Sequence, residues 1–228
     1  MKICGFQKLT LLDYPGKTAA TVFLGGCNFR CPFCHNGDLV LSHNSMDEIK
    51  REEVLRFLSK RKGLLDGVCV TGGEPLLWQD TKGFLKEIKE LGFLLKLDTN
   101  GYFPDRLKSV AEYLDYIAMD IKNSQSSYAT TAGLESLDIK EIEESVDFIK
   151  TSGIDHEFRT TVVKGLHTEE DMEEIGKWLK GENKYFLQPY RETEKVIDKR
   201  FSEFEPSELE TLLCAVKKYI PTAELRGV

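Results

Sequence analysis

The stretch Gly25-Gly26-Cys27-Asn28-Phe29-Arg30-Cys31-Pro32-Phe33-Cys34-His35-Asn36 places three cysteines at the spacing C-x3-C-x2-C. A [4Fe–4S] cluster is usually held by four thiolates, so three closely spaced ligands leave one iron open to a small molecule. A structural zinc site needs four ligands at other spacings, and His35, directly adjacent to Cys34, is poorly placed as the fourth. The triplet therefore favours an iron–sulfur cluster with one reactive iron. The remaining cysteines are scattered singly, at Cys4, Cys69 and Cys214.

On either side of this stretch, apolar segments of strand length alternate with helical patterns, which predicts a parallel sheet with crossover helices. The expected strands are residues 19–24, 67–70, 93–97, 116–119, 158–163 and 185–187. Six helices are expected to follow these strands. The first begins near Ser45 with a capping box to Glu48, and the second contains residues 84–91. The next two span residues 105–113 and 139–149, the fifth follows a cap at Thr168, and the last begins at Pro206. Six units rather than eight predict an α/β fold of the incomplete (βα)6 barrel type. We expect one domain over residues 1–228, with an N-terminal extension at 1–17 and the six units within 18–220.

Polar motifs follow the expected strands at their C-terminal ends. The cysteine loop follows the first strand, Gly72-Gly73-Glu74-Pro75 the second, Asp98-Thr99-Asn100-Gly101 the third, Asp120-Ile121-Lys122 the fourth and Gln188-Pro189-Tyr190-Arg191 the sixth. Barrels keep their active sites at that face, so we expect these motifs to form one site. A single Gly-Gly or an Asp-Thr-Asn-Gly turn would by itself be ordinary loop chemistry.

The bulk composition excludes several classes of function. The formal net charge of −7 argues against a nucleic-acid-binding surface, because such surfaces rely on clustered lysine and arginine. Hydrophobic residues make up 41% of the chain, and no stretch approaches the roughly twenty apolar residues of a membrane span. We expect a cytoplasmic protein that binds neither nucleic acid nor membrane.

The cysteine triplet, with an aromatic residue before its third cysteine and with Gly-Gly-Glu-Pro downstream, resembles the radical S-adenosylmethionine (SAM) enzymes. Within that superfamily, the Cys-Pro-Phe-Cys-His-Asn, Asp-Thr-Asn-Gly and Asp-Ile-Lys motifs are similar to those of activating enzymes of glycyl-radical enzymes. The opening Gly5-Phe6-Gln7-Lys8 and Leu12-Asp13-Tyr14-Pro15-Gly16-Lys17 resembles the long-form anaerobic ribonucleoside-triphosphate reductase activating proteins.

This resemblance implies a cofactor and a set of ligands. Cys27, Cys31 and Cys34 would hold a [4Fe–4S] cluster, which binds SAM at its open iron and cleaves it reductively to a 5′-deoxyadenosyl radical. The cofactor-binding residues that it implies are Phe33, His35, Gly72, Gly73, Glu74, Asp98, Asp120, Lys122 and Arg191. Among these, Glu74 would lie near the SAM ammonium group, Lys122 would pair with the SAM carboxylate, and Asp98 and Asp120 would bind the SAM amino acid and a monovalent cation. Arg191 departs from the pyruvate formate-lyase activating enzymes, which have histidine at the matching position.

The resemblance also implies partners: a glycyl-radical enzyme, with anaerobic ribonucleotide reductase the favoured one, and flavodoxin or ferredoxin as electron donor. Three alternatives stay open. The chain could activate pyruvate formate-lyase, it could act on a small molecule as the deazaguanine synthases do, or it could be a non-enzymatic iron–sulfur electron carrier. The sequence names neither the oligomeric state nor a role for Cys4 and Cys214, and Cys69 is expected to be a buried core thiol.

Overall fold

The computed structural model describes residues 1–194 and 196–227, so residues 195 and 228 of the expected domain lie outside the described part. The chain divides into two compact units. The first comprises residues 1–28, 38–118 and 141–155, and the second comprises residues 29–37, 119–140 and 156 to the C-terminal end. Within the described residues, no helix combines the length and the apolar character that a membrane span would need.

The first unit contains four strands in the order β1 (Ile3–Thr10), β2 (Ala19–Leu24), β3 (Gly67–Gly72) and β4 (Leu94–Thr99). β1 is antiparallel to β2, whereas β2, β3 and β4 are parallel, with Ala19 opposite Gly67 and Gly67 opposite Leu94. β2 pairs with a strand on each side, and five of its six side chains are fully buried: Ala19, Ala20, Thr21, Val22 and Leu24.

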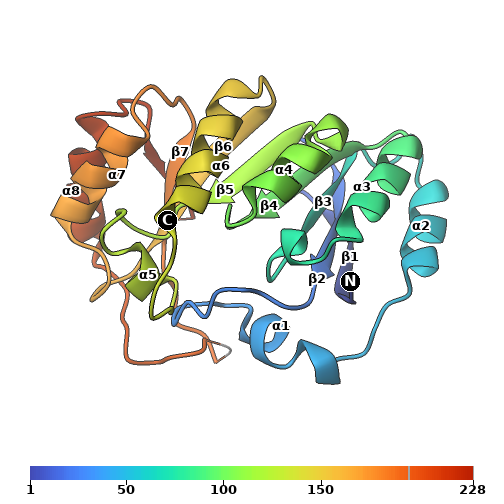
Figure 1. The fold of residues 1–228 in the computed structure, drawn as a ribbon, viewed down its shortest axis with the longest axis horizontal. Helices are drawn as coiled ribbons and strands as arrows, with labels where there is room; N and C mark the ends of the chain where they lie inside the picture. Colours follow the sequence, from blue (N-terminus) through green and yellow to red (C-terminus); the bar gives the residue numbers. More distant parts are fainter. Residues whose placement is uncertain (195, 228) are drawn as a thin grey trace. The chain divides into compact units, whose positions relative to one another are not determined.

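Helices α1 (Gly37–Leu41), α2 (Arg51–Ser59), α3 (Thr81–Glu90), α4 (Pro104–Val110) and α6 (Ile139–Thr151) accompany these strands, and the first residue of α1 and the first two residues of α6 belong to the second unit. Short 3₁₀ turns η1 (His43–Ser45), η2 (Pro75–Leu77) and η3 (Ala111–Tyr113) join them. Neighbouring helices α2, α3 and α4 pack in chain order, as Figure 1 shows. The apolar stripe of α3, which consists of Phe84, Leu85 and Ile88, is completely buried, as expected for an amphipathic helix on a sheet.

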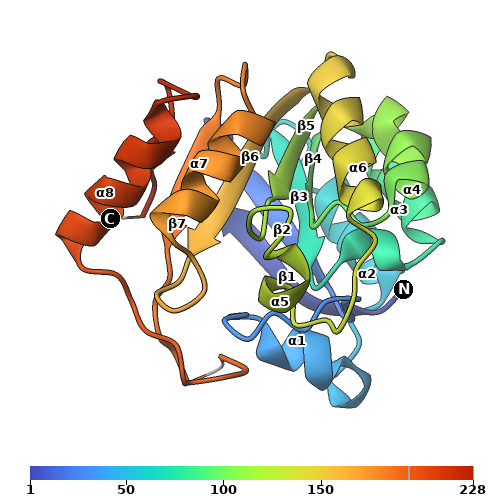
Figure 2. The same ribbon diagram turned by 60° about the vertical axis from the view of Figure 1, so that its left-hand side comes forward.

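The second unit contains β6 (Asp155–Val162), β7 (Tyr185–Pro189) and β8 (Glu224–Leu225), which pair in parallel in that order, and the helices α5 (Tyr128–Thr131), α7 (Glu169–Trp178) and α8 (Pro206–Lys217). The unit boundary crosses β5 (Tyr116–Asp120) after Ala118. Helices α7 and α8 pack against each other, as Figure 2 shows. Thr168 and Asp171 form a reciprocal capping box at the start of α7, and Pro206 occupies the first turn of α8.

The six predicted strands and the alternating α/β order are confirmed, the first strand to the residue and the others within a few residues. The predicted start of the first helix, near Ser45, was wrong. Ser45 ends the 3₁₀ turn η1, and Ile49 instead pairs with Ile3 of β1, its amide donating to the Ile3 carbonyl at 2.9 Å, so the helix begins only at Arg51. The strands β1 and β8 were not predicted.

Candidate active site

In the first unit, the expected motifs lie just beyond the C-terminal ends of three parallel strands. Cys27 follows β2, Gly73 and Glu74 follow β3, and Asn100 follows β4. Because the carboxyl ends of parallel strands meet at one edge of a sheet, the register of β2, β3 and β4 brings these motifs together. The structure therefore confirms that the three loops share one edge of this unit.

Glycine is required at positions 72 and 73 because the backbone there lies against the segment that leads to Cys27. A Cβ atom at Gly72 would lie 2.2 Å from the Leu24 carbonyl oxygen, and one at Gly73 would lie 2.0 Å from the Gly26 carbonyl oxygen. Gly72 also has φ of +128°, which residues with a side chain rarely adopt. The two glycines thus permit, first of all, a close approach to the chain's own backbone.

Glu74 is completely buried, and protein groups surround its carboxylate. One oxygen accepts hydrogen bonds from the Leu76 amide and the Thr99 hydroxyl, both at 2.9 Å, and the other accepts from the Asn100 amide at 2.7 Å. The buried charge is stabilised by these donors, since an unsatisfied buried carboxylate would be costly. Glu74 therefore fixes the loop after β3 to the loop after β4.

The side chain of Asn100, positioned in this way, reaches the first cysteine of the triplet. Its amide nitrogen Nδ2 lies 3.8 Å from Cys27 Sγ and donates to Asn28 Oδ1 at 2.9 Å. The Nδ2 of Asn28 is buried and has no hydrogen-bond partner in the described part of the chain. The Asn100 amide donor beside the Cys27 sulfur suits a site in which that sulfur carries negative charge.

Asp98 lies beside a buried cation. The Lys96 ammonium group forms a short hydrogen bond with the Asp98 carboxylate, and its side chain is only 2% exposed. Cys69 lies opposite Lys96 in the neighbouring strand, with its sulfur 3.7 Å from the Asp98 carboxylate and 3.8 Å from the Lys96 nitrogen. Cys69 is fully buried, as predicted, but it belongs to a polar cluster that the sequence did not indicate.

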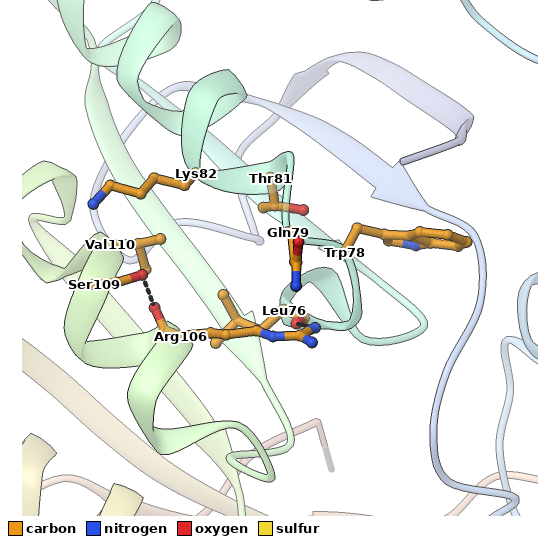
Figure 3. Close-up of a pocket in the computed structure, with 8 residues that line it drawn as sticks. All are labelled: Leu76, Trp78, Gln79, Thr81, Lys82, Arg106, Ser109 and Val110. Carbon is orange, nitrogen blue, oxygen red and sulfur yellow. Dashed lines mark hydrogen bonds between the residues drawn. The ribbon is translucent and has the colours of Figure 1, made fainter.

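Residues of η2, α3 and α4 line a pocket of about 170 Å³ next to the Gly-Gly-Glu-Pro loop. Figure 3 shows the Arg106 side chain extending toward Leu76. The Arg106 guanidinium donates to the carbonyl oxygens of Leu76 at 2.7 Å and Leu77 at 2.5 Å. The turn η2 is thus held from both sides, by Glu74 on one and by Arg106 on the other. We therefore interpret the residues that line this pocket as structural residues that support the turn.

The second unit holds the other two cysteines of the triplet. Cys31 is 7% exposed and Cys34 is half-buried, and the Cys34 amide donates to the Cys31 carbonyl at 3.0 Å. Burial raises the pKa of the Cys31 thiol to about 11 and also raises the pKa of the Cys34 thiol. Phe33 is buried between them, as expected for an aromatic residue in this loop.

Asp120, the last residue of β5, and Lys122, just after it, form a charged cluster with Arg159. Asp120 accepts hydrogen bonds from Arg159 Nε at 2.5 Å and from Lys122 Nζ at 2.8 Å. Burial by itself would raise the pKa of Asp120, but the two cations outweigh it and hold that pKa well below its usual range. Burial likewise opposes the charge of Lys122, but the Asp120 carboxylate raises the pKa of its ammonium group. Both groups stay charged.

His35 and Arg191 have different surroundings. The His35 ring packs against the ring of Tyr190, with centroids 5.6 Å apart, and burial lowers the pKa of His35. Tyr190 is fully buried, yet its hydroxyl has no partner within the described residues. Arg191 is exposed, and its guanidinium pairs with Glu203 at 2.6 Å. The guanidinium expected to bind SAM is thus engaged by a protein carboxylate.

Comparison with known proteins assigns the family. The model of the Radical SAM superfamily matches residues 21–179, which contain the cysteine triplet and the motifs after β3, β4 and β5. The chain belongs to the radical SAM superfamily. It is an enzyme of radical SAM chemistry, and the family implies a [4Fe–4S] cluster and SAM as cofactors.

Two relatives bear on the subgroup of this radical SAM enzyme. MJ1227 of Methanocaldococcus jannaschii, named as a glycyl-radical enzyme activating enzyme, is 32% identical over 99% of this chain and 96% of its own length. The pyruvate formate-lyase-activating enzyme of Clostridium pasteurianum is 33% identical over 54% of this chain and 52% of its own length. The crystal structure of Streptococcus suis SuiB has the same fold at a TM-score of 0.70, with 17% identity over 91% of this chain and 48% of that one.

The donors that are present fit a cluster. All six cysteines, which lie within the described residues, are thiols, and soft thiolate ligands are the ones that iron–sulfur clusters use. The Cys31 and Cys34 thiols need nearby positive charge to ionise, and the charge of Lys122 counteracts part of the rise in pKa that burial causes in both. Sequence reasoning missed Lys96 and Arg159, although a lysine or an arginine within an otherwise buried strand is a signal that could have identified them.

Proposed function

We propose that this radical SAM enzyme is an activating enzyme that generates a glycyl radical on a partner enzyme, and that the partner is anaerobic ribonucleoside-triphosphate reductase. The observation that carries the first part is the 32% identity to MJ1227 over almost the full length of both chains. The opening motifs, from Gly5 to Lys8 and from Leu12 to Lys17, support the choice of the reductase.

In this proposal, Cys27, Cys31 and Cys34 hold the [4Fe–4S] cluster. When bound, the cluster supplies the electron that cleaves SAM to methionine and the 5′-deoxyadenosyl radical. The chain itself contributes position and exclusion of water. Phe33 shields the loop between two ligands, and Asn100, which is held by Glu74, donates toward the Cys27 sulfur.

In this proposal, charged side chains and one backbone segment bind SAM. The Lys122 ammonium stays protonated and is suited to the SAM carboxylate, and the Gly73 backbone and the Asp98 carboxylate are suited to the SAM amino group. Glu74 acts in our proposal through Asn100 rather than on SAM directly, because protein donors already occupy both of its oxygens.

A monovalent cation near Asp98 and Asp120 also belongs to the proposal. Each of these carboxylates is matched by a protein cation, Asp98 by Lys96 and Asp120 by Lys122 and Arg159. Charge balance therefore does not require the ion, and its test is whether potassium or sodium changes the affinity for SAM. We further propose flavodoxin or ferredoxin as the source of the electron.

The proposal is tested by mixing the reduced, cluster-loaded protein and SAM with anaerobic ribonucleotide reductase. A glycyl doublet in electron paramagnetic resonance is expected, and it should vanish when the reductase glycine is changed to alanine. Pyruvate formate-lyase is the matched comparison. A doublet in pyruvate formate-lyase alone would overturn the partner, and no doublet in either enzyme, together with normal release of 5′-deoxyadenosine, would overturn the activating function.

A further inference from the structure

Four large apolar side chains of the first unit are exposed on two segments that lie away from the cysteine motifs. Leu9, near the end of β1, is 58% exposed, Leu11 and Leu12 in the turn that follows are 68% and 91% exposed, and Leu64 is 66% exposed in the loop between α2 and β3. A single exposed leucine is ordinary, but four in adjoining loops form a patch of the kind that marks an interaction site.

Hydrogen bonds join the two loops. The amide and the hydroxyl of Thr18 both donate to the Asp66 carboxylate, at 2.8 and 2.7 Å, and the Asp66 amide donates to the Thr18 carbonyl at 2.8 Å. The turn is also fixed from within, because the Thr21 hydroxyl donates to the Asp13 carboxylate at 2.5 Å and Tyr14 is buried. The leucines are therefore held outward on a rigid turn, which lowers the entropy cost of binding.

Positive charge surrounds these leucines in an otherwise acidic chain. Five exposed cations lie on the same segments, and within the described residues none of them forms an ion pair: Lys8, Lys17, Lys60, Arg61 and Lys62. Lys8 and Arg61 both lie over the ring of Phe57, at 5.7 and 5.1 Å from its centroid, which places β1 beside the α2–β3 loop. We call the four leucines and five cations the leucine-turn surface.

We propose that the leucine-turn surface docks an acidic segment with apolar side chains on the glycyl-radical partner enzyme. This inference rests on the proposed function. Charge complementarity selects an acidic occupant, since these two segments carry five cations against two carboxylates, Asp13 and Asp66, on a chain with a net charge of −7. A second copy of this chain is a poorer occupant, because a basic patch cannot meet the same patch of a second copy in a two-fold dimer without like-charge repulsion.

The position of the surface determines which kinetic constant it controls. The turn lies at the N-terminal end of β2, and Cys27 and Gly73 lie beyond the C-terminal ends of β2 and β3. A strand of six residues spans roughly 20 Å, so the surface cannot contact the reacting atoms. Contacts there hold the partner equally in the ground state and the transition state, and their loss should weaken binding without slowing the saturated reaction.

The test uses the reduced, cluster-loaded protein with SAM and a concentration series of anaerobic ribonucleotide reductase. The variants are Leu12→Ser and Lys62→Glu, and Lys140→Glu serves as the charge-matched control, since Lys140 is exposed in the second unit. Binding is measured by titration calorimetry, and initial rates of glycyl doublet formation are measured separately. Leu12 is 91% exposed, so its replacement removes little burial from the fold.

We expect Leu12→Ser to raise the dissociation constant and the half-saturating reductase concentration about tenfold, which corresponds to about 1.4 kcal/mol. The saturated rate and the release of 5′-deoxyadenosine without partner should not change. Lys62→Glu should weaken binding most at low salt, and Lys140→Glu should match the wild type. Unchanged binding in both surface variants would overturn the docking proposal, and so would a wild-type protein that does not bind the reductase.

Two further outcomes distinguish the docking proposal from the proposed activating function and from lipid binding. If the wild type binds the reductase and Leu12→Ser weakens that binding, but no doublet forms, the docking surface stands and the proposed activating function fails. If the wild type instead sediments with phosphatidylserine-containing vesicles, loses this property in Lys62→Glu, and shows no variant effect on reductase binding, the surface binds anionic lipid and the docking proposal is wrong.

Discussion

Replacing Glu74 by glutamine tests whether this carboxylate is the structural link between the two motif loops. The side chain is fully buried, and its two oxygens accept three hydrogen bonds, from the Leu76 amide, the Thr99 hydroxyl and the Asn100 amide. Glutamine has nearly the same shape, but one oxygen becomes an NH₂ group. In the less damaging orientation, this group faces the Asn100 amide, so two donors meet and one buried N–H loses its acceptor.

An unsatisfied buried donor costs about 1–3 kcal/mol, so Glu74→Gln should lower the free energy of unfolding by that amount. Glu74→Ala removes the acceptors of two buried amides, and because the Thr99 hydroxyl can rotate to another partner, we expect a loss of about 2–6 kcal/mol. The assay is urea unfolding of the reduced apo-protein under argon, followed by circular dichroism.

Glu90 provides the matched control, because it is exposed and its contact with Lys86, at 3.8 Å, is a weak surface pair. Glu90→Gln should stay within about 0.5 kcal/mol of the wild type. If Glu74→Gln also stays within this range, the carboxylate does not hold the two loops together, and the assignment of Glu74 as a positioning residue is wrong.

Three other expectations follow from the same geometry. Cys31→Ala should lose most of its bound iron and all SAM cleavage, while Cys214→Ala, at an exposed thiol, keeps both; full iron content in the Cys31 variant would remove the cluster assignment. Asn100→Ala, which lacks the donor toward Cys27, should make the midpoint potential of the cluster more negative, and an unchanged potential in redox titration would contradict this role. Burial lowers the pKa of His167, so as the pH falls the unfolded state takes up a proton before the folded state does. The free energy of unfolding should therefore fall as the pH drops below about 6.5, and urea titrations should show a smaller fall in His167→Gln.

The sequence predicted the framework because its signals are local. The strand β2 could be placed to the residue, since six consecutive residues of β-forming or small apolar type lie between a polar turn and the glycines of the cysteine loop. The caps at Thr168 and Pro206 were equally local, and both helices begin where these residues indicated. The alternation of strands and helices was enough to place the motifs at strand ends.

What the sequence did not predict depends on contacts between distant residues. The capping pattern at Ser45 was overridden because Ile49 pairs with β1, and β1 itself lacks a continuous apolar run. The role of Glu74 depends on donors from Thr99 and Asn100, about 25 residues further along the chain. No local pattern could show that these donors occupy the carboxylate.

The most direct test of the account follows the hydrogen atom itself. Anaerobic ribonucleotide reductase is prepared with α-deuterated glycine and is mixed with the reduced protein and SAM, and the released 5′-deoxyadenosine is analysed by mass spectrometry. If the chain abstracts the glycine hydrogen, 5′-deoxyadenosine carries one deuterium whenever the glycyl doublet forms. Release of 5′-deoxyadenosine without deuterium, in the presence of the bound deuterated partner, would contradict the central claim.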